Sequence, residues 1–174
     1  MASLEELRDE RLKKLETLRA KGINAYPIET NREATLFEAS ASFPKLSKKK
    51  KGISLVGRVM ALRGQGAIIF FNFFDGTGVF QGLFKKGEMD DKIFALFEST
   101  VDIGDFIEVR GPLFLTKRKE KTILVKEWKM LTKSLRPLPD KWHGLQDVEE
   151  RFRKRYLDTL MSPEVRERIL RAAP

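Results

Sequence analysis

The 174-residue sequence contains no cysteine and only one histidine, His143. The absence of cysteine excludes a disulfide scaffold and every metal site built on thiolates. Long hydrophobic runs are also missing, since no apolar stretch approaches the roughly 20 residues that a membrane-spanning helix needs. Residues 3–21 carry too many charges for the apolar centre of a signal peptide. These absences predict a soluble, cytoplasmic protein with no membrane partner.

Basic residues are abundant: 34 Lys and Arg stand against 25 Asp and Glu, which gives a formal net charge of +9. Such a balance favours a polyanionic partner, either a nucleic acid or an acidic membrane surface. Many basic proteins bind neither, so the charge alone does not decide the partner.

Leucines recur at helical spacing near the N-terminus, which predicts an amphipathic helix. Ser3 followed by Glu6 has the form of a capping box, and Gly22 stands where a left-handed residue would end the helix. We interpret the apolar stripe as packing against the body of the protein, in preference to a membrane-surface or partner helix. The stripe consists of Leu4, Leu7, Leu12, Leu15 and Leu18.

Residues 24–51 lack sustained periodicity and are interpreted as a connecting segment with one short helix near residues 35–40. The lysine run at its end is typical of a solvated loop that adds general attraction for phosphates.

From residue 53 onward the pattern becomes rich in β-strand residues, and Gly- and Asp-containing turn signals separate five runs. A short helix is expected around residues 93–97, between the third and fourth strands. The order β-β-β-α-β-β predicts an all-β core with flanking helices, in the form of a five-stranded OB-fold barrel. An SH3-like barrel is the alternative, which the helix after strand three disfavours. The expected strands are 53–63, 67–74, 79–84, 106–115 and 122–131.

Alternation along the second expected strand assigns its two faces. The set that contains Phe71 is wholly apolar and should face the interior, whereas the set that contains Asn72 should face outward. Phe70 is therefore predicted to be a solvent-facing ring, and Gln81 falls on the same side of the third strand. An unpaired base can stack on such a ring and be read by the donor and acceptor of the Gln amide. The residues alone are equally compatible with Phe70 packing beneath the N-terminal helix.

After the barrel, Pro137 and Pro139 predict an extended exit. A charged helix is expected over residues 146–160, and a second helix near Ser162-Pro163. This tail has little core of its own. The expected domains are 1–51 (N-terminal helix and connecting segment), 52–132 (OB-fold domain) and 133–174 (connector and helices).

The connector from Leu131 to Lys141, together with the segment from Arg11 to Pro27, resembles class II lysyl-tRNA synthetases of bacterial type. The likeness covers essentially the whole chain. It implies an anticodon-binding domain, with the chain expected to stop where the catalytic domain of such an enzyme begins. The implied function is recognition of the uridine-rich anticodon of a lysine tRNA, as the N-terminal part of an enzyme that attaches lysine to tRNA with ATP.

The resemblance also implies roles for particular residues. Phe70 would be the stacking platform and Gln81 a reader of a base edge. Arg63 would contact a base or its phosphate, and Glu120 would accept a hydrogen bond from a base N–H. Arg58 is a weaker candidate, which is equally compatible with a structural role.

Some of these residues do not follow directly from strand parity or from the family's usual sequence. Strand parity places Arg63 on the inner face, so a bulge in the first strand is required to turn it outward. The chain has Gly66-Ala67 where the family usually has Gly-Lys, and Lys119 where the turn before Glu120 usually ends in Gly. Asp75 matches a family position, but a turn-stabilising role is at least as well supported as contact with RNA.

No catalytic or metal-binding residue is expected in this chain, because none of the family's signature motifs falls within it, and the chain is expected to be inactive alone. No cofactor is expected in this fragment, whereas the resembled full-length enzyme uses ATP and Mg²⁺. The expected partner is lysine tRNA, and a homodimer is a further expectation for the full-length enzyme. We interpret His143 as a structural hydrogen-bonding residue.

Two other functions remain open from the sequence. One is a generic single-stranded nucleic-acid-binding OB module. The other is an assembly or dimerisation module, formed by the leucine-striped helix and the tail, with incidental RNA binding.

Overall fold

The computed structural model describes residues 3–49, 51–139, 145 and 147–172. The chain divides into two compact units, residues 1–136 and 137–174. His143 and part of the connector lie outside the described residues. The structural role predicted for His143 therefore stays a prediction. None of the helices in the described ranges is long and apolar enough to cross a membrane.

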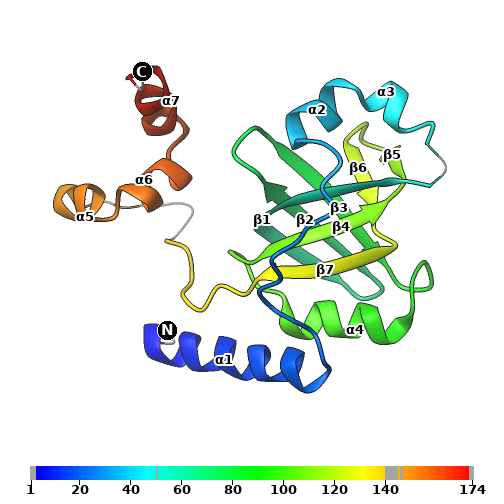
Figure 1. Ribbon diagram of the computed structural model, residues 1–174, viewed down its shortest axis with the longest axis horizontal. Coiled ribbons are helices and arrows are strands. Elements are labelled where there is room, and N and C mark those ends of the chain that lie inside the picture. Colours follow the sequence, from blue (N-terminus) through cyan, green and yellow to red (C-terminus); the bar gives the residue numbers. More distant parts are fainter. Residues whose placement is uncertain (1–2, 50, 140–144, 146, 173–174) are drawn as a thin grey trace. The chain divides into compact units, whose positions relative to one another are not determined.

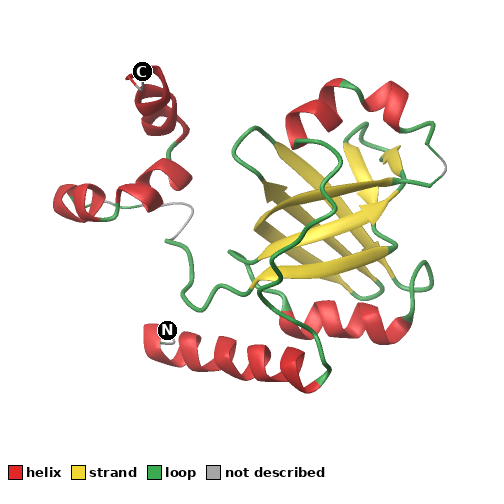
Figure 2. Ribbon diagram, viewed as in Figure 1, coloured by secondary structure: helices red, strands yellow, loops and turns green. Residues whose placement is uncertain are grey.

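A single sheet forms the centre of the first unit (Figure 1, Figure 2). Its strands, within the described part of the chain, are β1 (Ile53–Gln65), β2 (Ile68–Phe74), β3 (Val79–Lys85), β4 (Phe106–Gly111), β5 (Leu113–Leu115), β6 (Lys121–Leu124) and β7 (Glu127–Thr132). The strand order is β5-β6-β3-β2-β1-β4-β7, and every pair is antiparallel except β3 with β6. Because β4 leads into β5 and β6 into β7, the sheet closes into an OB-fold barrel. The predicted fold class is confirmed.

The fourth and fifth expected strands are each divided in two. Pro112 separates β4 from β5, since proline has no N–H to offer a neighbouring strand. A Cβ atom on Gly111 would lie 1.9 Å from the carbonyl oxygen of Leu124, so only glycine permits the two strands to cross there. The division lets β4 pair with β1 and β7, while β5 pairs with β6.

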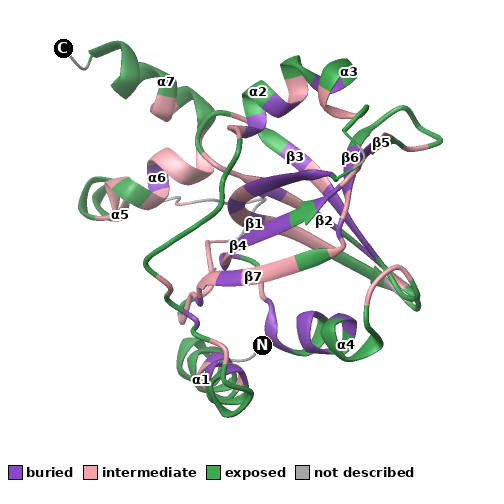
Figure 3. Cartoon of the chain, turned by 45° about the vertical axis from the view of Figure 1, so that its right-hand side comes forward, coloured by how far each residue is buried: buried purple, intermediate pink, exposed green. Residues whose placement is uncertain are grey.

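Phenylalanine rings fill the barrel. Phe71, Phe73, Phe84 and Phe97 are each at most 1% exposed, and the rings of Phe84 and Phe97 stack with centroids 3.8 Å apart. A Cβ on Gly82 would lie 2.0 Å from the Phe71 ring, so the ring occupies the space that this glycine leaves. Each buried ring contributes about 1.5–3 kcal/mol relative to an exposed one. Ile69, Phe71 and Phe73 are all buried, so the inward set predicted for the second strand is confirmed. Figure 3 colours the described residues of the chain by burial.

Helix α4 (Asp91–Thr100) covers one end of the barrel (Figure 1). Asp90 caps its first turn by accepting a hydrogen bond from the backbone N–H of Lys92 at 2.7 Å. The helix lies where the sequence predicts it, and its apolar face supplies the Phe97 ring to the core.

Helix α1 (Leu4–Ala20) begins and ends as the sequence predicts. Ser3 and Glu6 form both hydrogen bonds of a capping box, and Gly22 ends the helix with a φ of +72°. The predicted packing holds only for the C-terminal half of the leucine stripe, since Leu4 is 73% exposed. The buried leucines are Leu15 and Leu18.

The connecting segment contains the expected short helix, α2 (Leu36–Ala41), and a second, α3 (Phe43–Leu46), which the sequence pattern does not indicate. Thr35 and Glu38 form a capping box at the start of α2. Both helices lie at the end of the barrel opposite α4 (Figure 1).

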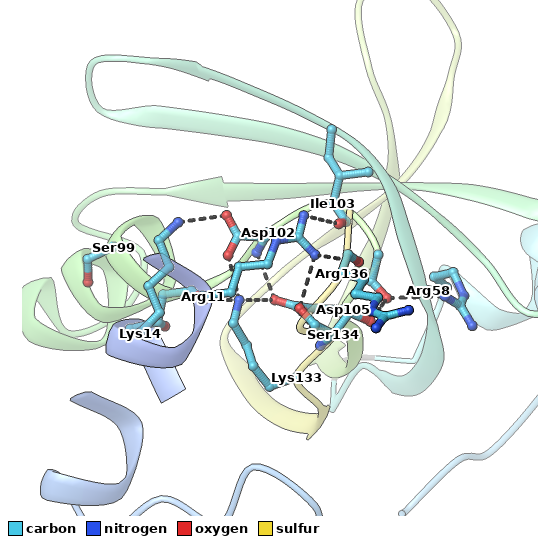
Figure 4. Close-up of polar contacts among 12 residues, drawn as sticks. Arg11, Lys14, Arg58, Ser99, Asp102, Ile103, Asp105, Lys133, Ser134 and Arg136 are labelled. Atoms are coloured by element: carbon cyan, nitrogen blue, oxygen red, sulfur yellow. Dashed lines mark hydrogen bonds and ion pairs between the residues drawn. The ribbon is translucent and has the colours of Figure 1, made fainter. Parts of the chain in front are cut away.

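Arg11 connects α1 to the segment that leaves the barrel (Figure 4). Its guanidinium donates hydrogen bonds, each 3.0 Å long, to the backbone oxygens of Ser134, Arg136 and Ile103. A single charged side chain thus satisfies carbonyl groups from two loops that are distant in sequence.

Lys133 extends this network into the interior (Figure 4). Its fully buried ammonium group lies 2.6 Å from a carboxylate oxygen of Asp102 and 2.7 Å from one of Asp105. Burial raises the pKa of Asp105, although Lys133 partly offsets the rise. For Asp102, burial also acts to raise the pKa, but hydrogen bonds from Lys133 and Lys14 outweigh it and hold the pKa below its usual value.

The second unit contains helices α5 (Val148–Arg153), α6 (Arg155–Met161) and α7 (Pro163–Ala172). The expected single helix over 146–160 is divided at Lys154, whose φ of −113° and ψ of 46° are not helical. The start of the last helix at Pro163 is confirmed. In the described part of this unit no apolar side chain is buried, and the buried residue is Asp158, which pairs with Arg151 and Arg155.

Candidate nucleic-acid interface

A bulge in β1 reverses the faces of that strand. Val59 and Ala61 are paired with consecutive residues of β2, which leaves Met60 between them as an extra residue. Beyond the bulge, Arg63 lies directly opposite Phe70 and therefore on the same outward face. The bulge that strand parity requires for Arg63 is confirmed.

Phe70 lies in the middle of β2 with 36% of its surface exposed. Its partner across the β2–β3 register is Leu83, which is only 8% exposed although it belongs to the outward set. The outward placement of Phe70 is confirmed. Its contact with a base stays a prediction.

Gln81 lies on the same face, on β3, next to two polar partners. Its Nε2 donates a hydrogen bond to Oε2 of Glu120 at 2.9 Å. Its Oε1 accepts a hydrogen bond from the hydroxyl of Thr122, at 2.7 Å. The parallel pairing of β3 with β6 places Thr122 opposite Gln81, so the backbone register brings these groups together. Gln81 and Glu120, which are both predicted to read bases, are thus hydrogen-bonded to each other.

The turn before Glu120 is held by Thr116, whose backbone N–H donates to the Glu120 carbonyl and whose hydroxyl accepts from the Glu120 N–H. Lys119 adopts a φ of +61°, in the left-handed region that glycine occupies most easily. Lys119 therefore adopts the backbone conformation that a glycine would adopt. Glu120 contacts Gln81 although the turn has no glycine at position 119.

Arg58 lies on the other side of the bulge from Arg63. Its guanidinium carbon is 4.4 Å from the centre of the Phe106 ring, and Nη1 donates to the Gly104 carbonyl at 3.5 Å. Burial lowers the pKa of this guanidinium. These contacts fit a structural role for Arg58. They do not include Phe70, Arg63 or Gln81.

Asp75 stabilises the turn between β2 and β3. Its carboxylate accepts hydrogen bonds from the backbone N–H groups of Thr77 and Gly78 and from the Thr77 hydroxyl. It also accepts from the backbone N–H of Leu36, at the start of α2, and from Arg32. Burial acts to raise the pKa of Asp75, but the hydrogen bonds from Thr77, Leu36 and Gly78 outweigh it and lower the pKa. The turn-stabilising interpretation is confirmed.

Exposed basic side chains occur on turns that follow strands of the sheet. Ala67, at the position where the resemblance implies a lysine, accepts a hydrogen bond from the backbone N–H of Lys86, whose side chain is exposed. On the β5–β6 hairpin, Lys117, Arg118 and Lys119 are exposed as well. Such charges attract phosphates without regard to sequence.

Thr122 is the member of this group that sequence reasoning missed. It is fully buried, and its closeness to Gln81 depends on the parallel register of two strands that are distant in the sequence. Alternation within the expected strand 122–131 was the available signal, but alternation does not reveal which strand lies alongside it.

Comparison with known proteins agrees with this geometry. The tRNA anti-codon family model, described as an OB-fold nucleic acid binding domain, matches residues 53–131. The lysine–tRNA ligase of Synechococcus sp. (strain CC9311) is 43% identical over 173 residues, which cover 98% of this chain and 35% of that protein. The lysine–tRNA ligase of Roseiflexus sp. (strain RS-1) is 41% identical over 94% of this chain and 34% of its own length.

The chain thus spans about a third of the length of these relatives. Residues 53–131 thus match an OB-fold nucleic acid binding domain, and the chain is similar over nearly its whole length to part of the lysine–tRNA ligases.

Proposed function

We propose that the outward face of β1, β2 and β3 binds the anticodon of a lysine tRNA. The whole protein would join lysine to tRNA, as the names of its relatives indicate for those proteins, and it would use ATP to do so. The observation that carries the proposal is the bulge at Met60, because it places Arg63 beside Phe70 on the face that also holds Gln81.

Each side chain has a chemical task in this proposal. A uracil base stacks on the Phe70 ring, which is worth about 1–3 kcal/mol per base. The Gln81 amide then offers a donor to uracil O4 and an acceptor to N3–H. Arg63 attracts the neighbouring phosphate or base, and Glu120 accepts from a base N–H through its second carboxylate oxygen. The net charge of +9 strengthens the approach of the tRNA.

In this proposal, the ATP and Mg²⁺ of the reaction belong to the whole protein. Among the described residues, no three His, Cys, Asp or Glu side chains gather in a metal-binding arrangement. A cytoplasmic location belongs to the same proposal.

A titration of the full chain with two RNA hairpins tests the proposal. One hairpin is the lysine anticodon stem-loop, and the other has the same stem with a scrambled loop. Fluorescence anisotropy at matched salt should show tighter binding of the lysine loop. Equal affinity, with log K falling by about 0.7 per neutralised phosphate for each tenfold rise in salt, would instead identify a generic single-strand binder.

The exposed apolar residues of the tail favour a second candidate function, which is assembly. Val148, Phe152, Tyr156 and Leu170 are each between 61% and 70% exposed. Sedimentation of residues 1–174 as a dimer, with residues 1–136 remaining monomeric, would support a homodimer formed through the tail. Two monomeric samples would argue against it.

A further inference from the structure

The Gln81 side chain is held from two sides by partners of different character. Glu120 carries a carboxylate, which only accepts hydrogen bonds, and it lies 2.9 Å from the amide nitrogen. Thr122 carries a hydroxyl, which lies 2.7 Å from the amide oxygen. The amide is thus fixed at both ends.

This arrangement permits only one orientation of the amide. Turning the amide by a half rotation would place its oxygen against the Glu120 carboxylate, where two acceptors would repel each other. The Thr122 hydroxyl is buried and therefore out of reach of solvent, and its other acceptor, the Glu120 carbonyl oxygen, is farther away, at 3.2 Å. Its proton is therefore directed at the oxygen of Gln81.

The orientation of this amide matters for base recognition. The two contacts use one N–H and one oxygen lone pair of Gln81, and an amide has two of each. Uracil presents an acceptor at O4 and a donor at N3, whereas cytosine presents a donor at N4 and an acceptor at N3. An amide held in one orientation matches only one of these orders, and an amide free to turn matches both.

We propose that Thr122 is a positioning residue that fixes the Gln81 amide in the orientation complementary to uracil and so lets this face discriminate against cytosine. This inference rests on the proposed function, in which Gln81 reads a base of the anticodon. Glu120 is exposed and is proposed to turn an oxygen toward RNA, whereas buried Thr122 keeps its place when RNA binds.

The test compares Thr122→Val, which replaces the hydroxyl with a methyl group, with Thr122→Ser, which retains the hydroxyl. The full chain is titrated with the lysine anticodon stem-loop and with loops in which single uridines are changed to cytidine. The preference of the wild type for uridine should fall by about three- to tenfold in the Val variant, the worth of one hydrogen bond. The Ser variant should keep it. If the Val variant prefers uridine over cytidine as strongly as the wild type does, the proposal is overturned.

A measurement without RNA separates this inference from the proposed function. In ¹⁵N NMR of the free protein, the Gln81 side-chain amide should show restricted motion in the wild type and in the Ser variant, and increased motion in the Val variant. An amide that is equally mobile in all three proteins overturns the fixed orientation, even where RNA binds as proposed. A restricted amide in a wild-type chain that binds uridine and cytidine loops equally overturns the proposed function and the specificity role with it.

Discussion

The Phe70 ring lies in the middle of a strand and is 36% exposed, which leaves part of the ring available to a ligand. A single exposed apolar side chain is ordinary on a protein surface. Phe70 differs from such a residue because Arg63 lies opposite its ring and Gln81 lies on the adjacent strand.

Phe70→Ala should weaken binding of the uridine-rich anticodon stem-loop by about 1–3 kcal/mol, because the stacking surface is removed. Fluorescence anisotropy measures the change. Phe152→Ala is the control, since Phe152 is an exposed ring on α5. Unchanged affinity in the Phe70 variant would remove this ring from the binding face, and loss of folding in a thermal melt would point to a packing role.

Asp75→Asn tests the turn between β2 and β3 through its dependence on pH. The pKa of Asp75 in the folded chain lies below its ordinary value of 3.8, so the carboxylate stabilises the fold above that pH and loses this effect as the pH falls through the folded pKa. Near neutral pH the variant should be less stable by about 1–2 kcal/mol.

Urea denaturation of both proteins at about pH 7 and about pH 3 checks this expectation. The difference between wild type and variant should shrink at the lower pH. A constant difference would show that the pKa of Asp75 is not lowered.

At the residue scale, side chains whose position follows from alternation could be predicted, and those that depend on distant partners could not. Phe70 and Gln81 belong to the first kind. Lys133 belongs to the second, because a lysine in a connector is normally solvated, and only the folded chain shows the two carboxylates that surround it.

At the scale of elements, α1 is held to the barrel by a charged side chain in addition to its leucines. Arg11→Met should destabilise the first unit by about 2–3 kcal/mol, because the carbonyls of three residues lose a charged donor. Arg8→Met, an exposed position on the same helix, is the control and should have little effect. Equal urea midpoints for the two variants would show that the Arg11 contacts contribute nothing.

The sequence predicted the elements whose own pattern is sufficient, namely α1, α2, β1, β2, β3, α4 and the start of α7. It missed the break between β6 and β7. The breaks at Pro112 and Lys154 were missed for different reasons. The first arises where β4 and β6 cross, which is a tertiary contact at Gly111. The second falls in a charged stretch that contains no glycine or proline to mark it.

At the scale of the whole molecule, the division between the two units falls after Arg136. A chain ending at residue 136 should therefore keep the melting temperature of the first unit. A chain ending at residue 132 lacks Lys133 and leaves the carboxylates of Asp102 and Asp105 without its ammonium group. That chain should be less stable by about 3–5 kcal/mol.

Differential scanning calorimetry of both truncated chains checks this prediction. Similar melting temperatures for the two would mean that the buried lysine is dispensable. A failure of the longer piece to fold would mean that the tail contributes to the first unit.

The extra residue at Met60 also constrains how homologous chains can vary. Because of this extra residue, the odd-numbered residues of β1 face the interior before Met60, and the even-numbered residues face it after Met60. A relative with one residue fewer here would need the opposite polar and apolar order from 61 to 65, or it would turn its arginine toward the phenylalanine core. Single-residue gaps at this point should therefore be accompanied by an inverted pattern downstream.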